Sequence, residues 1–485
     1  MCPESPLASR FPGQQVAAFG VPVFGTTGLL RSHPIRRMLG VTHTDSGVDD
    51  PTDMETSVHL PSSPATHAGV ETRSHPGVIV LCMFITVIEG FNLIVFGSAV
   101  PLLLKDSSLG LTDQQTGLVG GLVYIGAIVG SVTAPWVADR IGRKNVLLLG
   151  IGLFALGGIL TGSAISVAML AAARFVTGFG VGVALTTAMT TARNNAAANR
   201  ASLVVTITMA GIPLGGVVAA LIAIPVLPAF GWRPMFFVGA GAAIVIMVAT
   251  VLMAIPTDTP QEIAGRSWTS RQKLRLMFTG RGLIATTLIA ACAIANMVAW
   301  QGLNVWGAQT MTELGYSLRV ALLVTFALTG AAVIGSFVSA WAADRHGSAV
   351  IGIATSACTV IGLVGMLTLP LSLPATMICV GLMGIGGHST MNLVHTTTAD
   401  IFPLPVRATA LGWSNGTSFI GAFFGPVLGG AAIAAGGAHG VFTVFAMSAT
   451  ICLVAVSALC AADRAVHRRT EGTRTPDGSD ELIVA

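Results

Sequence analysis

Long apolar runs recur through most of the chain and constrain its fold more than any other feature. Between residues 78 and 461, such runs alternate with short segments that contain charges, Gly or Pro. A helix needs roughly 20 apolar residues to cross the hydrocarbon core of a bilayer, and most of the runs reach that length. Of the 485 residues, 53% are hydrophobic and 9% are charged, whereas a soluble domain has roughly 25% charged residues. The sequence therefore predicts a multi-pass membrane protein.

Twelve membrane-spanning helices are predicted from these runs. They lie near residues 78–104, 117–138, 145–163, 167–190, 202–224, 233–255, 283–307, 320–343, 348–369, 374–398, 408–433 and 439–461. The longest interruption, residues 256–282, follows the sixth span. We therefore expect an all-α membrane protein of two six-helix bundles, 77–255 and 283–461, joined by a linker.

The two ends of the chain differ from its middle. Residues 1–76 are rich in Pro, Ser, Thr, Gly and charge, so we expect a disordered tail. We treat Met38 and Met54 as candidate starts within that tail, a hypothesis that N-terminal peptide mass spectrometry would test. Residues 462–485 are also polar and form a second predicted tail.

The distribution of Lys and Arg predicts the orientation of the spans. Loops after odd-numbered spans contain only Lys105, Arg233 and Arg319. Loops after even-numbered spans contain Arg140, Arg143, Lys144, Arg193, Arg200, Arg266, Arg271, Lys273, Arg275, Arg281, Arg345 and Arg407. Because Lys and Arg are enriched in cytoplasmic loops, we expect both termini and the linker in the cytoplasm.

The two predicted bundles resemble each other in sequence. The segment GSVTAPWVADRIGRK (130–144) follows the second span, and GSFVSAWAADRHGSA (335–349) follows the eighth. GIPLGG (211–216) in the fifth span corresponds to GPVLGG (425–430) in the eleventh. Transporters use such repeats to place a binding site between two halves and to expose it alternately to either side.

One acid and one base lie well inside the predicted spans. Glu89 interrupts the apolar run VIEGFNLIVFG (87–97), and Arg174 lies in the fourth span. An ionised side chain in the middle of a bilayer is costly, so such residues are functional candidates. A Glu89 that meets Arg174 in only one conformation would change its proton affinity during a transport cycle. The alternative is a permanent ion pair that ties two helices together.

Candidate substrate-binding residues are polar or aromatic side chains inside spans. Asn92 and Arg174 are candidates in the first half, and Arg174 could clamp a carboxylate with two hydrogen bonds. The candidates in the second half are Asn296, Trp300, Asn304, His388, Asn392, Trp413 and Asn415. His388 could also relay a proton. The alternative for each residue is a structural role, because membrane helices use amides to bond to one another and Trp to anchor at the interface.

The loop after the second span resembles the signature loop of the major facilitator superfamily. The copy after the eighth span lies where that family has a second one. The resemblance implies twelve spans in two pseudo-symmetric bundles, and a conformational latch at the two loops. The predicted latch residues are Asp139, Arg140, Gly142, Arg143, Lys144, Asp344 and Arg345. Asp139 can pair there with Arg140, Arg143 or a neighbouring helix end.

Within the superfamily, the chain is similar to the aromatic acid:proton symporters over residues 78–460. The similarity rests on EGFNLIVFGSAVPLLLKD, RFVTGFGVGVAL, GIPLGG, GWRPMFFVGA and RATALGWSNGTSFIGAFFGPVLGG. The family's D-G-[FY]-D motif is replaced here by Glu89-Gly90-Phe91-Asn92, and Phe419 stands where the family usually has Arg. These replacements remove charges that the family uses.

We therefore expect a secondary transporter in the inner membrane that imports a small organic acid, of benzoate or hydroxybenzoate type, with protons. It would be multi-pass and would function as a monomer, with no nucleic-acid partner. We expect neither cofactor nor metal, because no Walker sequence or metal-ligand cluster occurs in the spans and the proton gradient would supply the energy. The alternatives are a proton-coupled exporter of drugs or metabolites and a membrane sensor that does not transport. An enzyme is not expected.

Overall fold

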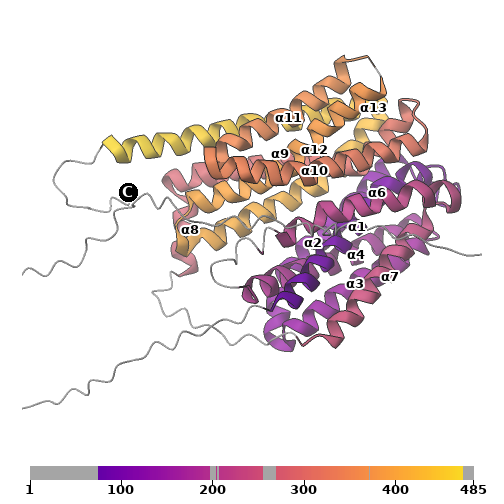
Figure 1. Cartoon of the computed structure of the whole chain (residues 1–485), viewed down its shortest axis with the longest axis horizontal. Coiled ribbons are helices and arrows are strands. Elements are labelled where there is room, and N and C mark those ends of the chain that lie inside the picture. Colours follow the sequence, from indigo (N-terminus) through magenta and orange to yellow (C-terminus); the bar gives the residue numbers. More distant parts are fainter. Residues whose placement is uncertain (1–74, 197–203, 205–206, 255–268, 371, 473–485) are drawn as a thin grey trace, which may run out of the picture. The chain divides into compact units, whose positions relative to one another are not determined.

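The regular structure of the chain is helical wherever it is described (Figure 1). The computed structural model describes residues 75–196, 204, 207–254, 269–370 and 372–472. The predicted disordered N-terminal tail lies outside these ranges, apart from its last residues, as does the first part of the predicted linker.

The first six predicted spans correspond to helices of the first half. These are α1 (Pro76–Leu103), α2 (Asp113–Ile141), α3 (Arg143–Gly162), α4 (Val167–Asn194), α6 (Gly211–Phe230) and α7 (Arg233–Leu252). The helix that contains α6 is long and apolar enough to span a membrane from Ile207 onward. Part of the predicted fifth span, which began at residue 202, lies outside the described residues.

The second half contains one short helix and the remaining spans. Its elements are α8 (Ser270–Phe278), α9 (Gly280–Glu313), α10 (Leu318–His346), α11 (Ser348–Thr368), α12 (Leu373–Ile401) and α13 (Leu404–Gly472). Helix α8 lies inside the predicted linker and was not expected. Helix α13 also continues into the predicted C-terminal tail, which we expected to begin at residue 462.

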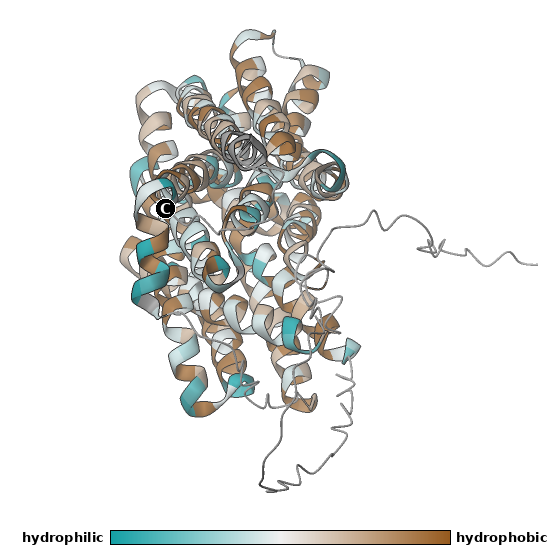
Figure 2. Ribbon diagram, turned by 90° about the vertical axis from the view of Figure 1, so that its left-hand side faces the viewer, coloured by the Kyte–Doolittle hydropathy of each residue, from teal (hydrophilic) through white to brown (hydrophobic). Residues whose placement is uncertain are grey.

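Helix α13 contains the last two predicted spans. Its backbone is non-helical at Gly436 and Gly437, between the predicted ranges 408–433 and 439–461. In the described part of the chain, eleven helices are long and apolar enough to cross a membrane, and the last of them contains this break. Hydrophobic residues recur along the helices (Figure 2), and many of the large ones are exposed, as a surface in contact with lipid requires. The prediction of an all-α membrane protein is confirmed.

Several helices begin at residues that cap them. The Thr112 hydroxyl accepts a hydrogen bond from the Gln115 backbone N–H (3.2 Å), and the Gln115 side chain accepts one from the Thr112 N–H (3.1 Å). This reciprocal pair satisfies two N–H groups that have no partner within α2. At α4, the Ser166 hydroxyl accepts a single hydrogen bond from the Met169 backbone N–H (3.2 Å). Capping places the polar start of each helix outside its apolar run.

Glycines allow close contact between neighbouring helices. A Cβ atom at Gly90 of α1 would collide with the Ile212 carbonyl of α6, and one at Gly178 of α4 would collide with the Val123 carbonyl of α2. Small residues at such crossings allow helices to approach closely, which drives packing between apolar helices in lipid. The glycine-rich motifs of these spans therefore build the helix interfaces.

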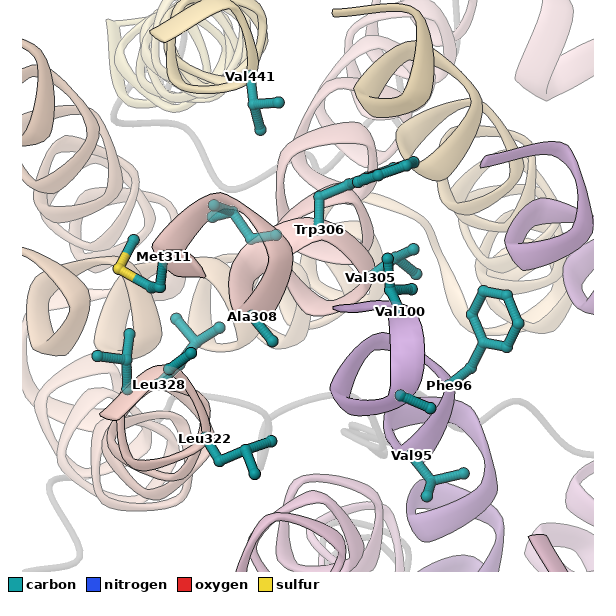
Figure 3. Close-up of a cluster of buried hydrophobic side chains, with 14 of the residues drawn as sticks. Val95, Phe96, Val100, Val305, Trp306, Ala308, Met311, Leu322, Leu328 and Val441 are labelled. Carbon is teal, nitrogen blue, oxygen red and sulfur yellow. The ribbon is translucent and has the colours of Figure 1, made fainter. Parts of the chain in front are cut away.

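The two halves contact each other at one end of their helices. We call the end that contains Arg140 and Arg143 the basic end. Toward the opposite end, Gly97 of α1 packs against the Asn304 and Val305 backbone of α9. Apolar side chains of α1 and α9 fill the same region, among them Phe96, Val100, Val305 and Trp306 (Figure 3). The halves are therefore closed against each other away from the basic end.

Candidate substrate and proton site

Glu89 lies in the middle of α1 and is buried. Only 1% of its side chain is exposed. Neither carboxylate oxygen has a hydrogen-bond partner among the described residues. Burial of a charged carboxylate without a partner costs far more than burial of a neutral carboxyl group. The surroundings of Glu89 therefore favour the neutral form of its side chain, which holds a proton.

Arg174 of α4 is equally buried, and its guanidinium contacts α1. Its Nη1 donates a hydrogen bond to the Asn92 carbonyl (3.4 Å). The guanidinium carbon lies 4.6 Å from the centre of the Phe96 ring. The Nε atom has no hydrogen-bond partner in the described ranges. Part of the hydrogen-bonding capacity of Arg174 thus remains unused in this conformation.

Glu89 and Arg174 do not form an ion pair here. Both carboxylate oxygens of Glu89 lack a partner in the part of the chain that the structure describes. The permanent ion pair that the sequence left open is therefore not present in this conformation. The functional role of either residue stays a prediction.

The side-chain amide of Asn92 contacts its own helix, α1, and the neighbouring helix α7. Its Nδ2 donates to the Ile88 carbonyl (3.0 Å), and its Oδ1 lies against Gly239 of α7. Only 2% of the residue is exposed. Asn92 therefore supports Arg174 through its backbone carbonyl, while its amide faces α7.

Tyr124 of α2 joins this group, although the sequence interpretation passed over it. It is 3% exposed and close enough to Arg174 for an electrostatic interaction. It packs in a cluster with Leu93 of α1 and with Met297 and Phe419 of the second half. Tyr124 is one of only two tyrosines in the chain and the one inside a predicted span, a signal that could have identified it. We call Glu89, Asn92, Tyr124 and Arg174 the central polar site.

In the second half, α9 and α12 bring a tryptophan and a histidine together. The Trp300 and His388 ring centres are 5.9 Å apart, and the rings are tilted by 52°. The buried Nε2 of His388 has no partner among the described residues. His395 lies two turns further along α12, and Asn392 lies between the two histidines. This i, i+4, i+7 spacing could have identified His395, which the sequence interpretation missed.

Two predicted amides have structural partners. Asn296 of α9 donates to the Gly387 carbonyl of α12 (2.9 Å), the interhelical bond that the sequence left as its alternative. Asn304 donates to the Trp300 carbonyl one turn earlier (2.8 Å). The Oδ1 atom of Asn304 has no partner in the described ranges and remains available. Asn304 is thus the better placed of the two for a ligand.

Trp413 and Asn415 are not brought into this group. The Trp413 indole donates to the Thr286 carbonyl near the start of α9 (3.2 Å). Trp300 follows Thr286 by fourteen residues in the same helix, which is about 21 Å along its axis. Asn415 is exposed, two residues from Trp413. A single binding pocket therefore does not include Trp413 together with Trp300.

The predicted latch has a different set of contacts from the one expected. Asp139, expected to pair with a neighbouring base or helix end, is exposed and has no described partner. Instead, the Lys144 ammonium donates to the Val251 and Met253 carbonyls at the end of α7, both at 2.8 Å. Arg140 stacks on Trp136 at 3.6 Å. Lys144, not Asp139, therefore connects this loop to its neighbour.

The second copy of the loop repeats part of this geometry. Arg345 stacks on Trp341 at 3.7 Å, as Arg140 does on Trp136. Both loops turn at a glycine with positive φ, Gly142 at 81° and Gly347 at 90°. The backbone of a residue other than glycine is strained in that conformation. Asp344, like Asp139, is exposed and has no partner among the described residues.

A groove of about 330 Å³ lies apart from all these residues. It runs between α9 and α13, and its apolar lining consists of Leu288, Thr450, Ile451, Val454, Ala455 and Ala458. Ile451 and Val454 are more than half exposed. The groove belongs to the apolar outer surface and contains none of the predicted site residues.

Comparison with known families places the chain among transporters. A family model described as Major Facilitator Superfamily matches residues 82–381 and, in an overlapping match, residues 289–480. The chain belongs to the Major Facilitator Superfamily. It is thus a multi-pass transporter of the cell membrane that carries small molecules, and not an enzyme.

Relatives of known function are similar along most of their length. The gentisate transporter of Corynebacterium glutamicum is 30% identical over 403 residues, covering 81% of this chain and 89% of that protein. The benzoate transport protein of Acinetobacter baylyi is 24% identical, covering 74% of this chain and 84% of its own. A solved structure, the D-xylose-proton symporter, has a TM-score of 0.65 at 17% identity and covers 79% of this chain and 96% of its own. That likeness supports the fold alone.

Proposed function

We propose that the chain imports a small aromatic carboxylic acid together with a proton by alternating access. The support from relatives is that proteins similar over most of this chain transport gentisate, benzoate and, in Acinetobacter baylyi, 4-hydroxybenzoate. Each of these compounds joins an aromatic ring to a carboxylate. The substrate therefore needs one cationic partner and an apolar, ring-lined wall.

The observation that carries the proposal is the buried, unpartnered carboxyl group of Glu89. An ionised carboxylate there would lack both water and a counter-ion, so Glu89 is accommodated as a neutral acid. Opening of the contact between the halves would then admit water to Glu89, and a shift of α1 against α4 within the first half would bring the Arg174 guanidinium to it, so that Glu89 releases its proton. This difference between conformations couples proton movement to transport.

Arg174 is the proposed partner of the substrate carboxylate. Guanidinium binds carboxylates with two parallel hydrogen bonds, and the Nε of Arg174 is free of described partners. Tyr124, which interacts electrostatically with Arg174, is a second candidate to bind the carboxylate through its hydroxyl. On the opposing half, Met297, Phe419 and the neighbouring apolar cluster offer a surface for the ring. Phe419, where the family usually has Arg, thus makes this wall apolar.

One carboxyl group suggests one proton for each substrate. A monoanion that moves with one proton forms a neutral pair, so a pH gradient of one unit supports roughly tenfold accumulation. The protein would work as a monomer without a cofactor. We also infer from the Lys and Arg distribution that the basic end and both termini face the cytoplasm. The closed contact between the halves then lies on the outer side.

The test is uptake of labelled gentisate, benzoate and 4-hydroxybenzoate into proteoliposomes with an imposed inward proton gradient. We expect accumulation above the external concentration for one or more of these acids, and its loss when an ionophore collapses the gradient. An aliphatic acid of similar size is the control for ring recognition. Accumulation only under an outward gradient would indicate an exporter, and binding without accumulation would indicate a sensor. Either result contradicts the proposal.

A further inference from the structure

Helix α8 is a short amphipathic helix immediately before the first spanning helix of the second half. It begins with a reciprocal cap, in which the Thr269 N–H donates to Gln272 Oε1 (2.9 Å) and the Gln272 N–H donates to the Thr269 hydroxyl (3.3 Å). Gly280, with φ of 53°, then turns the chain directly into α9. Helix α8 therefore lies at the level where α9 enters the membrane.

One face of α8 packs on the protein. Met277 is 1% exposed and belongs to a core cluster of α9, α12 and α13, and the Met277 carbonyl accepts a hydrogen bond from Thr286 (2.8 Å). Phe278 packs edge-on against Trp413, with ring centres 5.2 Å apart. These contacts fix α8 in place, so its outer face has a defined direction.

The outer face combines basic and apolar side chains. Arg271 and Arg275 are exposed and one turn apart, and Leu274 (48% exposed) and Phe278 (37% exposed) are also one turn apart beside them. Exposed apolar residues continue into the first turn of α9 with Leu283 and Ile284. This face is therefore continuous with the lipid-facing surface of α9.

All the charged residues of α8 and of the turns that flank it in the sequence are basic. Residues 269–283 contain Arg271, Lys273, Arg275 and Arg281 and no Asp or Glu. Within the described ranges, none of these bases forms a salt bridge. Basic amphipathic helices bind at membrane surfaces, where apolar residues enter the acyl boundary and Lys or Arg reach the headgroups. The charge is complementary to anionic phospholipid.

We propose that the outer face of α8 binds the headgroups of anionic phospholipids in the bilayer that surrounds the transporter. Leu274 and Phe278 enter the acyl boundary, while Arg271 and Arg275 contact phosphate oxygens. The transporter thereby retains a layer of anionic lipid next to α9. This inference does not depend on the identity of the substrate or on proton coupling.

The test uses full-length protein in phosphatidylcholine vesicles that contain brominated phosphatidylglycerol or, separately, brominated phosphatidylcholine. Bromine quenches tryptophan fluorescence over short distances, and Trp413 is in contact with α8. The Trp413 signal is the difference between the tryptophan fluorescence of the wild type and that of the variant Trp413→Phe. We expect stronger quenching of this signal by phosphatidylglycerol than by phosphatidylcholine at equal mole fraction.

The variant Arg271→Gln/Arg275→Gln should lower this preference by about fivefold or more, since one basic residue near an anionic surface contributes about fivefold in binding. The matched control, Lys105→Gln/Arg319→Gln, removes the same charge from exposed residues at the opposite end and should leave the preference unchanged. If the double variant of α8 does not fold, high salt should reduce the wild-type preference instead. Equal quenching by the two lipids in the wild type, or an unchanged preference in the α8 variant, would overturn the proposal.

Discussion

Near the middle of the first half, the buried polar groups include an acid and a base, Glu89 and Arg174. The repeat that aligns residue 130 with residue 335 places Ile294 and Cys379 at the corresponding positions of the second half. There, the buried polar groups include the amides of Asn296 and Asn304, the Trp300 indole and the imidazole of His388. The difference suggests a division of labour, in which the first half binds the charges and the second half contacts the ring.

The same contrast is found at the end of the molecule opposite the basic end. In the first half, Asp106 accepts hydrogen bonds from the Trp232 indole (2.9 Å) and from Arg233 (3.0 Å), which ties the turn after α1 to the start of α7. In the second half, the corresponding turn after α9 is tied to α12 by the hydroxyls of Tyr316 and Thr376 (3.0 Å). An ionic connection in one half is thus a neutral one in the other. Substitutions that remove a charge should therefore reduce transport or stability more in the first half than in the second.

The largest effect is expected at Arg174. Arg174→Gln removes the only buried cation of the central polar site and should reduce uptake, as kcat/KM, by about 30-fold or more, since loss of one partner of a buried charge pair costs at least about 2 kcal/mol. Arg174→Lys should recover part of the loss, because Lys keeps the charge but not the planar fork. Arg319→Gln, at an exposed site, is the control. An unchanged KM in Arg174→Gln would refute the assignment of charge binding to the first half.

A smaller effect is expected at Trp300. Trp300→Ala should raise the KM for an aromatic acid between about two- and tenfold, because aromatic contacts contribute about 0.5–1.5 kcal/mol beyond buried area. Trp300→Phe keeps a ring and should lie between Ala and the wild type. Trp413→Ala tests the residue that the structure separates from this group, and its KM should match that of the wild type. A larger effect at Trp413 than at Trp300 would place the ring elsewhere.

Lys144 tests the contrast between the two copies of the signature loop. Lys144→Gln weakens two hydrogen bonds to the end of α7, for which the second loop, with Ala349 at the aligned position, has no counterpart. We expect the transport rate to fall by about tenfold with substrate affinity unchanged, since a hydrogen bond to a charged group contributes about 1.5 kcal/mol at the lower end of its range. Uptake rates and equilibrium binding, measured on the same preparation, separate the two quantities. Lys105→Gln is the control, and a loss of affinity alone would contradict a latch.

The smallest effect concerns the Asp106 connection and its dependence on pH. Hydrogen bonds from Ser108 and Trp232 hold the pKa of Asp106 at about 2, below its ordinary value of 3.8. The stabilisation is complete above about pH 4 and is lost as the pH falls through 2, because the folded state then takes up the proton. Asp106→Asn should therefore lower the Tm slightly at pH 5 and not at pH 2. Tyr316→Phe, in the neutral connection, should shift the Tm equally at both values.

The sequence predicted the fold well because the length of an apolar run is a local property of the sequence. The span boundaries differ where polar residues extend a helix past its apolar run, as at α9, which ends at Glu313 and not near residue 307. Helix α8 was missed because a nine-residue amphipathic helix is too short to register in a search for spans. The cap at Thr269 and the alternation of basic and apolar residues that follows were its signals.

The sequence identified the charged members of the central polar site but not how they are arranged. Glu89 and Arg174 were found because charge is rare in an apolar run, and a pairing between them could not be judged without coordinates. Tyr124 and His395 were missed because the residues that surround them come from other parts of the chain. Trp413 was predicted to join Trp300 because both are tryptophans inside predicted spans. Residue type does not reveal that Trp413 contacts α9 at Thr286, about four turns before Trp300.

The most direct test of the central claim measures protons and substrate together. Wild-type protein and Glu89→Gln, in weakly buffered proteoliposomes, are given the transported acid without an imposed gradient, and the external pH is recorded during uptake. The account predicts that the wild type takes up protons with the acid, while Glu89→Gln still exchanges labelled for unlabelled acid but moves no protons. Asp106→Asn, a loss of a carboxylate outside the site, should behave as the wild type. Proton uptake by Glu89→Gln at the wild-type ratio would show that Glu89 does not carry the proton.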